Sequence, residues 1–157
     1  MNSLSDKYAP ALSIGAVATL INVSVQTLRL YEQKGLILPH RTKSGRRKYS
    51  IHDVERLKQI RKMIIEQGLN LNGVRSQLSL IPCWNFKGGF DDDCKNCPAA
   101  YETMEPCWNI KNVGPKCQNQ DCRECPVYQL EINHERLKEV FNPILPGIKT
   151  NTKINME

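Results

Sequence analysis

The residues with the greatest chemical potential in this 157-residue sequence are seven cysteines, all placed between positions 83 and 125. Thiolates bind soft metal ions and take part in redox reactions, and in a reducing cytosol such clustering favours these uses over structural disulfides. An odd number also prevents complete pairing within one chain. The cysteines, all candidate metal ligands, are Cys83, Cys94, Cys97, Cys107, Cys117, Cys122 and Cys125.

Six of these cysteines belong to an internal repeat over residues 83–128. Each copy contains Cys-Trp-Asn-x-Lys, starting at Cys83 or Cys107, followed by Cys-x-x-Cys-Pro and a tyrosine, whereas Cys117 occurs only in the second copy. The pattern resembles the two-CW domain of bacterial regulatory proteins, in which the cysteines are suspected of binding metal. The region is therefore expected to be a duplicated module that binds metal.

Two ligand sets are compatible with the repeat. In the first, one Cys-x-x-Cys pair from each copy forms a four-sulfur tetrahedral site. In the second, each copy contributes three sulfurs and Cys117 completes one site. Thiolate sites suit zinc, copper(I) or iron–sulfur clusters, and the spacing does not choose among them.

The helices and strands that would position this module are expected in the N-terminal half of the chain, whose net charge is opposite in sign to that of the cysteine-rich half. Residues 1–81 carry 13 Lys and Arg against 5 Asp and Glu, a net charge of +8, whereas residues 82–157 carry 9 against 11, a net charge of −2. A segment with this excess of positive charge attracts phosphate polyanions. No apolar run is long enough to span a membrane, and residues 1–12 lack the features of a signal peptide, so we expect a cytoplasmic protein.

The basic half begins with the pattern of a helix-turn-helix. Ser13 is an N-cap for a helix over Ile14–Ile21, and Ser24 caps a second helix from Val25 to about Lys34, which Gly35 ends. Two short helices around a three-residue turn place the second helix in the DNA major groove. Residues 40–49 then form a basic hairpin with Ser44-Gly45 at its turn, which is the pattern of a wing that lies along the phosphate backbone.

Two further helices complete the core of this half. Ser50 and Asp53 form a capping box for a helix whose apolar stripe contains Val54, Leu57, Ile60, Ile64 and Ile65. Gly68 ends this helix and Asn70 caps the next one. In that helix Leu71, Val74, Leu78 and Leu80 or Ile81 continue the core until Pro82.

At this point the sequence from about Leu12 to Ile81 resembles the MerR-type DNA-binding domain. The resemblance is carried by Ser13-Ile14-Gly15, by Val23–Glu32, by Arg46–Ser50 and by Gly68-Leu69-Asn70-Leu71. Within this family the sequence is most similar to the heat-shock repressor branch. This similarity is carried by the arginine-rich wing and by Leu30, which stands where an aromatic residue is common in the family. The resemblance implies a homodimer on an inverted repeat of double-stranded DNA, with RNA polymerase as a further partner at the promoter.

Carried over by position, the resemblance implies DNA contacts from the second helix and from the wing. The candidates in the helix are Ser24, Gln26, Thr27, Arg29 and Tyr31, and those in the wing are Arg41, Lys43, Arg46, Arg47, Lys48 and Tyr49. Gln26 near the helix start is placed to read a base edge, whereas the wing charges position the protein without reading sequence. The family usually dimerises through a long helix after this domain. The only later candidate here is the short amphipathic segment Tyr128–Phe141.

Four interpretations of the cysteines stay open at this stage. Structural zinc would stabilise about 46 residues that hold few aliphatic side chains. A sensory metal ion or iron–sulfur cluster would change the affinity for DNA. Reversible oxidation would follow if neighbouring lysines lowered the thiol pKa values. The fourth interpretation is that the thiols are inert.

Other candidates for chemistry are weaker. A Cys-x-x-Cys redox enzyme requires an alternating strand and helix pattern that is missing here, so we expect no enzyme. His134 is expected to be a surface histidine rather than a ligand, and Asp91-Asp92-Asp93 a solvated loop rather than a site for a hard cation.

The predicted fold is mainly α: a winged helix-turn-helix followed by a small irregular cysteine-rich domain. Its expected parts are a DNA-binding domain (12–81), a metal-binding domain (82–128), a short helix (129–142) and a flexible tail (143–157). The predicted function is a transcription regulator. The alternative is an accessory or architectural DNA-binding protein whose cysteine module recruits a protein partner.

Overall fold

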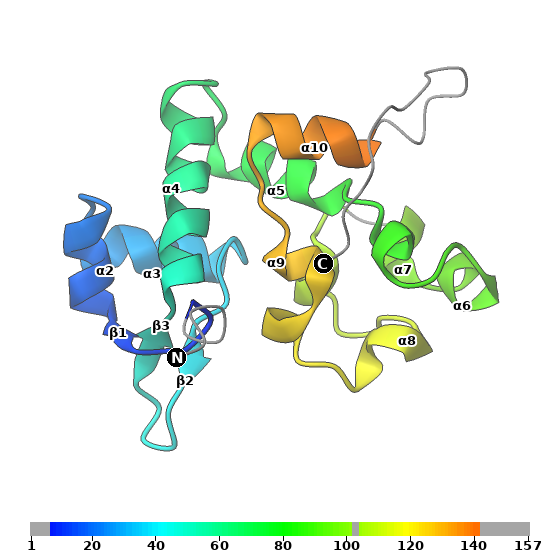
Figure 1. The fold of residues 1–157 in the computed structure, drawn as a ribbon, viewed down its shortest axis with the longest axis horizontal. Helices are drawn as coiled ribbons and strands as arrows, with labels where there is room; N and C mark the ends of the chain where they lie inside the picture. Colours follow the sequence, from blue (N-terminus) through cyan, green and yellow to red (C-terminus); the bar gives the residue numbers. More distant parts are fainter. Residues whose placement is uncertain (1–6, 102–103, 142–157) are drawn as a thin grey trace.

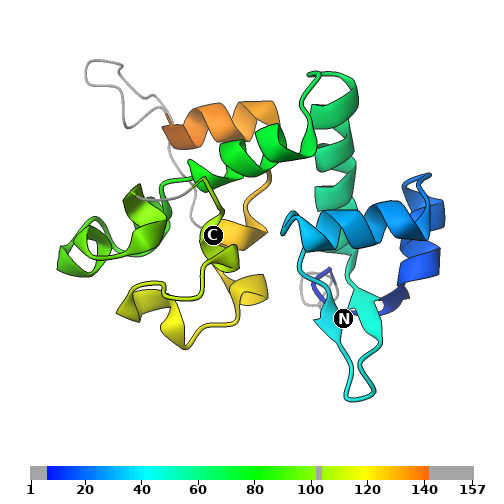
Figure 2. The same cartoon turned by 180° about the vertical axis from the view of Figure 1, so that it is seen from behind.

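The computed structural model describes residues 7–101 and 104–141 and is mainly helical. The N-terminal half lies on one side of the molecule and the cysteine-rich half on the other, with α4 and α5 between them (Figure 1). The same arrangement is seen from behind in Figure 2. The mainly helical structure, with a small three-stranded sheet, confirms the predicted fold class. In the described ranges, no helix combines the length and the apolar character needed to cross a membrane.

The helix-turn-helix consists of α2 (Ile14–Leu20) and α3 (Val25–Gln33). As predicted, Ser13 caps α2 by accepting a hydrogen bond from the Ala16 N–H, and Ser24 caps α3 by accepting one from the Thr27 N–H. Between the helices Asn22 has a φ of 54°, in the left-handed region that asparagine tolerates. The turn therefore reverses the chain without a glycine.

The wing is the hairpin of β2 (His40–Arg41) and β3 (Arg47–Tyr49). A third short strand, β1 (Leu12–Ser13), pairs with the other edge of β3, so the antiparallel strand order is β1-β3-β2. Gly45 has a φ of 79° at the tip, and its N–H donates to the Thr42 carbonyl oxygen at 2.8 Å. The sheet fixes the hairpin to the base of the helix-turn-helix.

Helices α4 (Ile51–Ile65) and α5 (Leu71–Ser79) form the middle of the molecule. The predicted capping box is present, since Ser50 and Asp53 bond reciprocally, and Asn70 caps α5. One apolar residue of the predicted α4 stripe is misplaced: Ile65 is 67% exposed. Met63 is buried instead, because the last turn of α4 presents that face to the core.

The two copies of the repeat adopt matching turns. Each Cys-Trp-Asn motif forms a 3-10 turn after a proline, η1 (Cys83–Phe86) and η2 (Cys107–Asn109). The first Cys-x-x-Cys runs from Cys94 in α6 (Asp92–Lys95) to Cys97 just before α7 (Pro98–Tyr101). The second runs from Cys122 in η3 (Cys122–Glu124) to Cys125 just before α9 (Pro126–Gln129). Helix α8 (Pro115–Gln118), which carries Cys117, has no counterpart in the first copy.

The chain ends its described part in α10 (His134–Phe141), which runs beside α5 in both views (Figures 1 and 2). The prediction of one helix over Tyr128–Phe141 is therefore wrong. The helical pattern is interrupted at residues 130–133, where Asn133 accepts a hydrogen bond from the Arg136 N–H at 2.8 Å and so starts a new helix. The predicted flexible tail lies outside the described residues.

Candidate nucleic-acid interface and cysteine sites

Helix α3 presents a polar face that is free of the core. Gln26 and Arg29, three positions apart on this face, are exposed. The opposite face is anchored by Leu28 and Tyr31, which are 0% and 6% exposed. Tyr31, which was predicted to contact DNA, has its ring in the core, where burial raises its pKa.

The hydroxyls of α3 have a structural use. Ser24 Oγ and Thr27 Oγ1 lie 2.9 Å apart, and Ser24 also accepts the Thr27 N–H at 3.0 Å. These bonds close the first turn of the helix. Ser24 remains exposed and Thr27 is half-buried, so both stay at the end of α3 where a base edge would approach.

The wing separates into a free tip and a tethered base. Lys43 and Arg46 are exposed at the tip and form no ion pair within residues 7–101 and 104–141, and Lys48 is half-buried. Tyr49, by contrast, is 0% exposed, and burial raises its pKa to about 12. Its predicted role in DNA contact is corrected to a core role, because β3 is the central strand and turns this ring inward.

Glu32 joins the recognition helix to the wing. Its two carboxylate oxygens accept from Arg41 Nη2 at 2.7 Å and from Arg47 Nε at 2.5 Å. The Glu32 side chain is only 16% exposed, so these pairs are better protected from solvent than surface salt bridges. Two of the predicted phosphate-binding arginines thus also fix the position of the wing against α3.

A buried arginine links the two halves of the chain. Arg56 of α4 is 3% exposed and donates from Nε to the Leu36 carbonyl oxygen (3.0 Å) and from Nη1 to the Tyr128 carbonyl oxygen (2.8 Å). Its guanidinium carbon lies 4.3 Å from the centre of the Tyr128 ring and 5.0 Å from that of Trp108. The sequence analysis missed this residue, because a single arginine on an amphipathic helix gives no signal of burial.

The second repeat holds the segment that connects α3 to the wing at three places. Trp108 Nε1 donates to the Gly35 carbonyl oxygen at 2.7 Å, and the Leu38 N–H donates to Tyr128 Oη at 2.8 Å. Arg123, between the cysteines of the second Cys-x-x-Cys, contacts His40 Nδ1 at 2.7 Å. Each bond joins the cysteine module to the six residues 35–40, which run from the end of α3 into the first strand of the wing and set the geometry between the two.

The first repeat makes no such contact in the described part of the chain. Trp84, the counterpart of Trp108, packs edge-on against Phe90 with ring centres 5.3 Å apart. Tyr101, the counterpart of Tyr128, is 62% exposed, whereas Tyr128 is 1% exposed. The duplicated sequence therefore serves two different environments, and the second copy supplies the hydrogen bonds to the segment between α3 and the wing.

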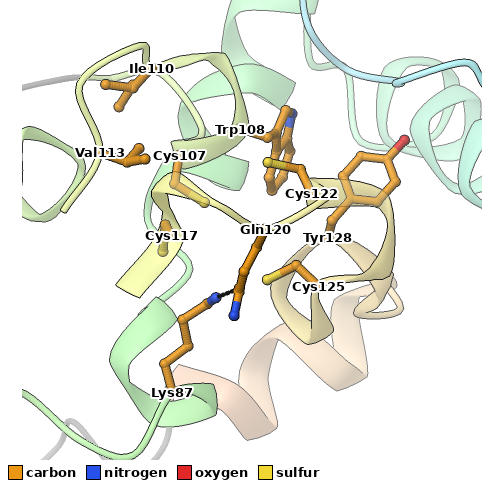
Figure 3. Close-up of a pocket in the computed structure, with 10 residues that line it drawn as sticks. All are labelled: Lys87, Cys107, Trp108, Ile110, Val113, Cys117, Gln120, Cys122, Cys125 and Tyr128. Atoms are coloured by element: carbon orange, nitrogen blue, oxygen red, sulfur yellow. Dashed lines mark hydrogen bonds between the residues drawn. The ribbon is translucent and has the colours of Figure 1, made fainter. Parts of the chain in front are cut away.

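The cysteines line two small cavities. Cys107, Cys117, Cys122 and Cys125 surround the hydrogen bond between Lys87 and Gln120 in one of them (Figure 3). Cys83, Cys94, Cys97 and Cys117 line the other. All seven are free thiols, and across residues 7–101 and 104–141 no three Cys, His, Asp or Glu side chains are grouped closely enough to hold a metal ion in this conformation.

Of the two predicted ligand sets, this arrangement favours the one in which each copy contributes three sulfurs. The two Cys-x-x-Cys pairs do not converge, because each lines its own cavity together with the Cys-Trp-Asn cysteine of the same copy. Three cysteines from each copy line the same cavity instead. Cys117 lines both cavities, which the spacing did not reveal.

Burial keeps several of these thiols protonated. It raises the pKa of Cys83 to about 11 and that of Cys107 to about 12, and it also raises the pKa of Cys117 and Cys122. Lys87 acts in the opposite direction on Cys117, but burial is the larger effect. Burial therefore outweighs the lysines in setting the pKa of these four thiols, which weakens the case for reversible oxidation.

The weaker candidates behave as surface groups. His134 is exposed at the start of α10, as predicted. Asp91 forms an ion pair with Lys116, and Asp92 forms one with Lys95 at 2.7 Å, so these carboxylates are engaged by lysines.

A basic hairpin beside an exposed recognition helix defines the winged helix-turn-helix class of DNA-binding proteins. Residues 12–80 match the family model "MerR HTH family regulatory protein". The chain is also 30% identical over 133 residues to the mercuric resistance operon regulatory protein of Bacillus cereus, an alignment that covers 74% of this chain and 93% of that protein. The chain therefore belongs to the MerR family of helix-turn-helix regulators.

Other relatives match the DNA-binding half alone. The transcriptional regulator GlnR of Bacillus anthracis is 41% identical over 72 residues, which is 46% of this chain and 55% of GlnR. The putative heat shock protein HspR of Streptomyces coelicolor is 37% identical over 71 residues, 45% of this chain and 47% of HspR. The chain thus spans about half of the length of these relatives, and the similarity to HspR agrees with the predicted branch.

Proposed function

We propose that this protein is a promoter-specific transcription regulator of the cytoplasm that binds an inverted repeat of double-stranded DNA as a homodimer. The observation that carries the proposal is the exposed pair Gln26 and Arg29 on α3, beside a wing whose tip presents Lys43 and Arg46. A major-groove helix reads base edges, and a cationic tip binds phosphate. The bound dimer would act on RNA polymerase at the promoter, and no catalytic role is assigned to the chain.

We further propose that the cysteine module binds a soft metal ion, with zinc favoured over an iron–sulfur cluster. The two cavities are small, about 50 Å³ and about 30 Å³, so they suit ions rather than organic effectors, which need several hundred Å³. Sulfur ligands select zinc and copper(I) among the common ions. The relative from Bacillus cereus is named for mercuric resistance, and mercuric ion is also a soft metal ion.

The module would support DNA binding by fixing the segment between α3 and the wing. Trp108, Tyr128 and Arg123 all bond to this segment, and all three lie within the second repeat. Metal binding would order that repeat, since about 46 residues with few aliphatic side chains have little core of their own. Loss of metal would then loosen the geometry that DNA binding needs.

Selection of bound duplexes from a random library, followed by sequencing, tests the DNA-binding proposal. The wild-type protein should enrich an inverted repeat, and Gln26→Ala should relax the preference at one position of each half-site. The variant Lys43→Ala should instead weaken binding to all selected sequences alike. A library that shows no enrichment would contradict promoter-specific binding and favour the accessory DNA-binding role.

A further inference from the structure

Helix α8 lies between the two sets of cysteines and is fastened to the first repeat. Lys116 forms an ion pair with Asp91 and donates to the Lys87 carbonyl oxygen at 3.3 Å. Just before the helix, the Gly114 N–H donates to Cys97 Sγ at 3.2 Å. A second-copy element is thereby held against the first Cys-x-x-Cys.

Gly114 allows this close approach. A Cβ atom built at Gly114 would lie 3.1 Å from the Asp93 carbonyl oxygen and 3.3 Å from Cys97 Cβ, distances tighter than ordinary contact. The next turn carries Cys117, which lines the cavity of Cys83, Cys94 and Cys97 and also that of the second repeat. The one cysteine outside the repeat is therefore the one shared by both cavities.

We infer that the seven cysteines bind two zinc-like divalent ions, with the thiolate of Cys117 bridging the two. The inference rests on the proposed metal-binding role of the module. Four-sulfur tetrahedral coordination needs four donors for each ion, and each repeat supplies three. One shared thiolate completes both sets and accounts for an odd number of cysteines with none left over. The first site would contain Cys83, Cys94, Cys97 and Cys117, and the second Cys107, Cys117, Cys122 and Cys125.

The surroundings of the cavities suit such a centre. Seven thiolates carry more negative charge than two divalent ions can neutralise. Lys87 lines both cavities and Lys116 lines the cavity of the first repeat, so two positively charged side chains lie beside this excess of negative charge. The hydrogen bond from the Gly114 N–H to Cys97 Sγ is of the kind that stabilises a thiolate. On binding, each thiol loses its proton to solvent, and changes of side-chain rotamer draw the sulfurs inward.

The test is the number of metal ions per chain and the way in which they are connected. Full-length protein purified without oxygen and loaded with zinc should carry two ions per chain by native mass spectrometry. Replacement of zinc by ¹¹³Cd should give two NMR signals that are coupled to each other through a shared sulfur. This measurement uses the wild-type chain and does not depend on the folding of a variant.

Three variants separate the bridge from the individual sites. Cys97→Ser should weaken only the first site and Cys125→Ser only the second, whereas Cys117→Ser should weaken zinc binding at both by at least tenfold and abolish the coupling between the ¹¹³Cd signals. One ion per chain, two uncoupled signals, or a Cys117→Ser variant that affects one site alone would overturn the bridged centre while leaving a metal-binding module in place. A chain that binds DNA but no metal would contradict the metal-binding role itself.

Discussion

The indole N–H of Trp108 donates a hydrogen bond of 2.7 Å to the carbonyl oxygen of Gly35. This bond joins the second Cys-Trp-Asn motif to the turn that ends the recognition helix. Gly35 has a φ of 68° and is buried, so the turn has little freedom to adjust if its partner is lost. The relationship between these two residues connects the chemistry of the cysteines to the surface proposed to bind DNA.

Replacing Trp108 by phenylalanine should weaken this connection. Phenylalanine keeps an aromatic ring beside Arg56 but cannot donate to Gly35, so we expect the free energy of unfolding to fall by about 1 kcal/mol. DNA affinity should fall by about fivefold, which corresponds to a similar free energy. The measurements are urea denaturation and fluorescence anisotropy with a labelled duplex. The matched control is Trp84→Phe in the first repeat, and equal losses of DNA affinity in the two variants would contradict the special role of Trp108.

A side chain at Gly35 should destabilise the protein. A Cβ atom built there would lie 1.8 Å from Asn109 Nδ2, and the positive φ adds strain for any L-residue. We expect Gly35→Ala to reduce the free energy of unfolding by more than 2 kcal/mol. Gly45→Ala, at a φ of 79° with open space around it, should lose only about 1 kcal/mol.

The double variant Gly35→Ala/Asn109→Ala identifies the source of the loss at Gly35. Gly35→Ala is expected to lower the free energy of unfolding more than Gly45→Ala does. Removing the Asn109 amide should recover this difference, because it removes the clash with the new Cβ atom. Thermal denaturation of the four proteins provides the comparison. No recovery in the double variant would mean that the second repeat does not approach Gly35 as closely as described.

The docking of the cysteine module should depend on pH through His52. Burial lowers the pKa of this histidine below its ordinary value of 6.5, and its ring nitrogen contacts the Gln129 carbonyl oxygen at 3.1 Å. The unfolded chain therefore binds a proton more readily than the folded one as the pH falls below about 6.5, and the free energy of unfolding decreases. The variant His52→Gln should lose this part of the pH dependence, whereas His134→Gln, at an exposed position, should keep it. The measurement is the free energy of unfolding at pH 7.5 and at pH 5. An equal change between the two pH values in wild type and in His52→Gln would contradict this role of His52.

The helix starts could be predicted because they depend on local chemistry. Ser13, Ser24, Ser50 and Asn70 each cap the helix that follows them, as the sequence indicates. Burial was harder to predict. Tyr31 was expected on the DNA face because the family resemblance was carried over position by position, but whether a side chain faces the core depends on the packing of distant residues.

The relation between the two halves was beyond the sequence for a similar reason. Trp84 and Trp108 have the same neighbours in sequence, yet only Trp108 contacts the DNA-binding half. A repeat predicts equal local turns, which are present, but it does not predict which copy docks. Likewise the sequence left open whether the two Cys-x-x-Cys pairs share one site, and the fold places them at separate cavities, both of which Cys117 lines.

The most direct test of the account is the salt dependence of duplex binding by the wild-type protein and by Lys43→Ala/Arg46→Ala. Each lost phosphate contact lowers the slope of log affinity against log salt by about 0.9, so the double variant should lower it by about two for each bound protomer. Lys111→Ala/Lys138→Ala removes the same charge from exposed positions of the cysteine-rich half and should leave the slope unchanged. A wing variant with the wild-type slope would contradict the proposal that this hairpin lies on DNA.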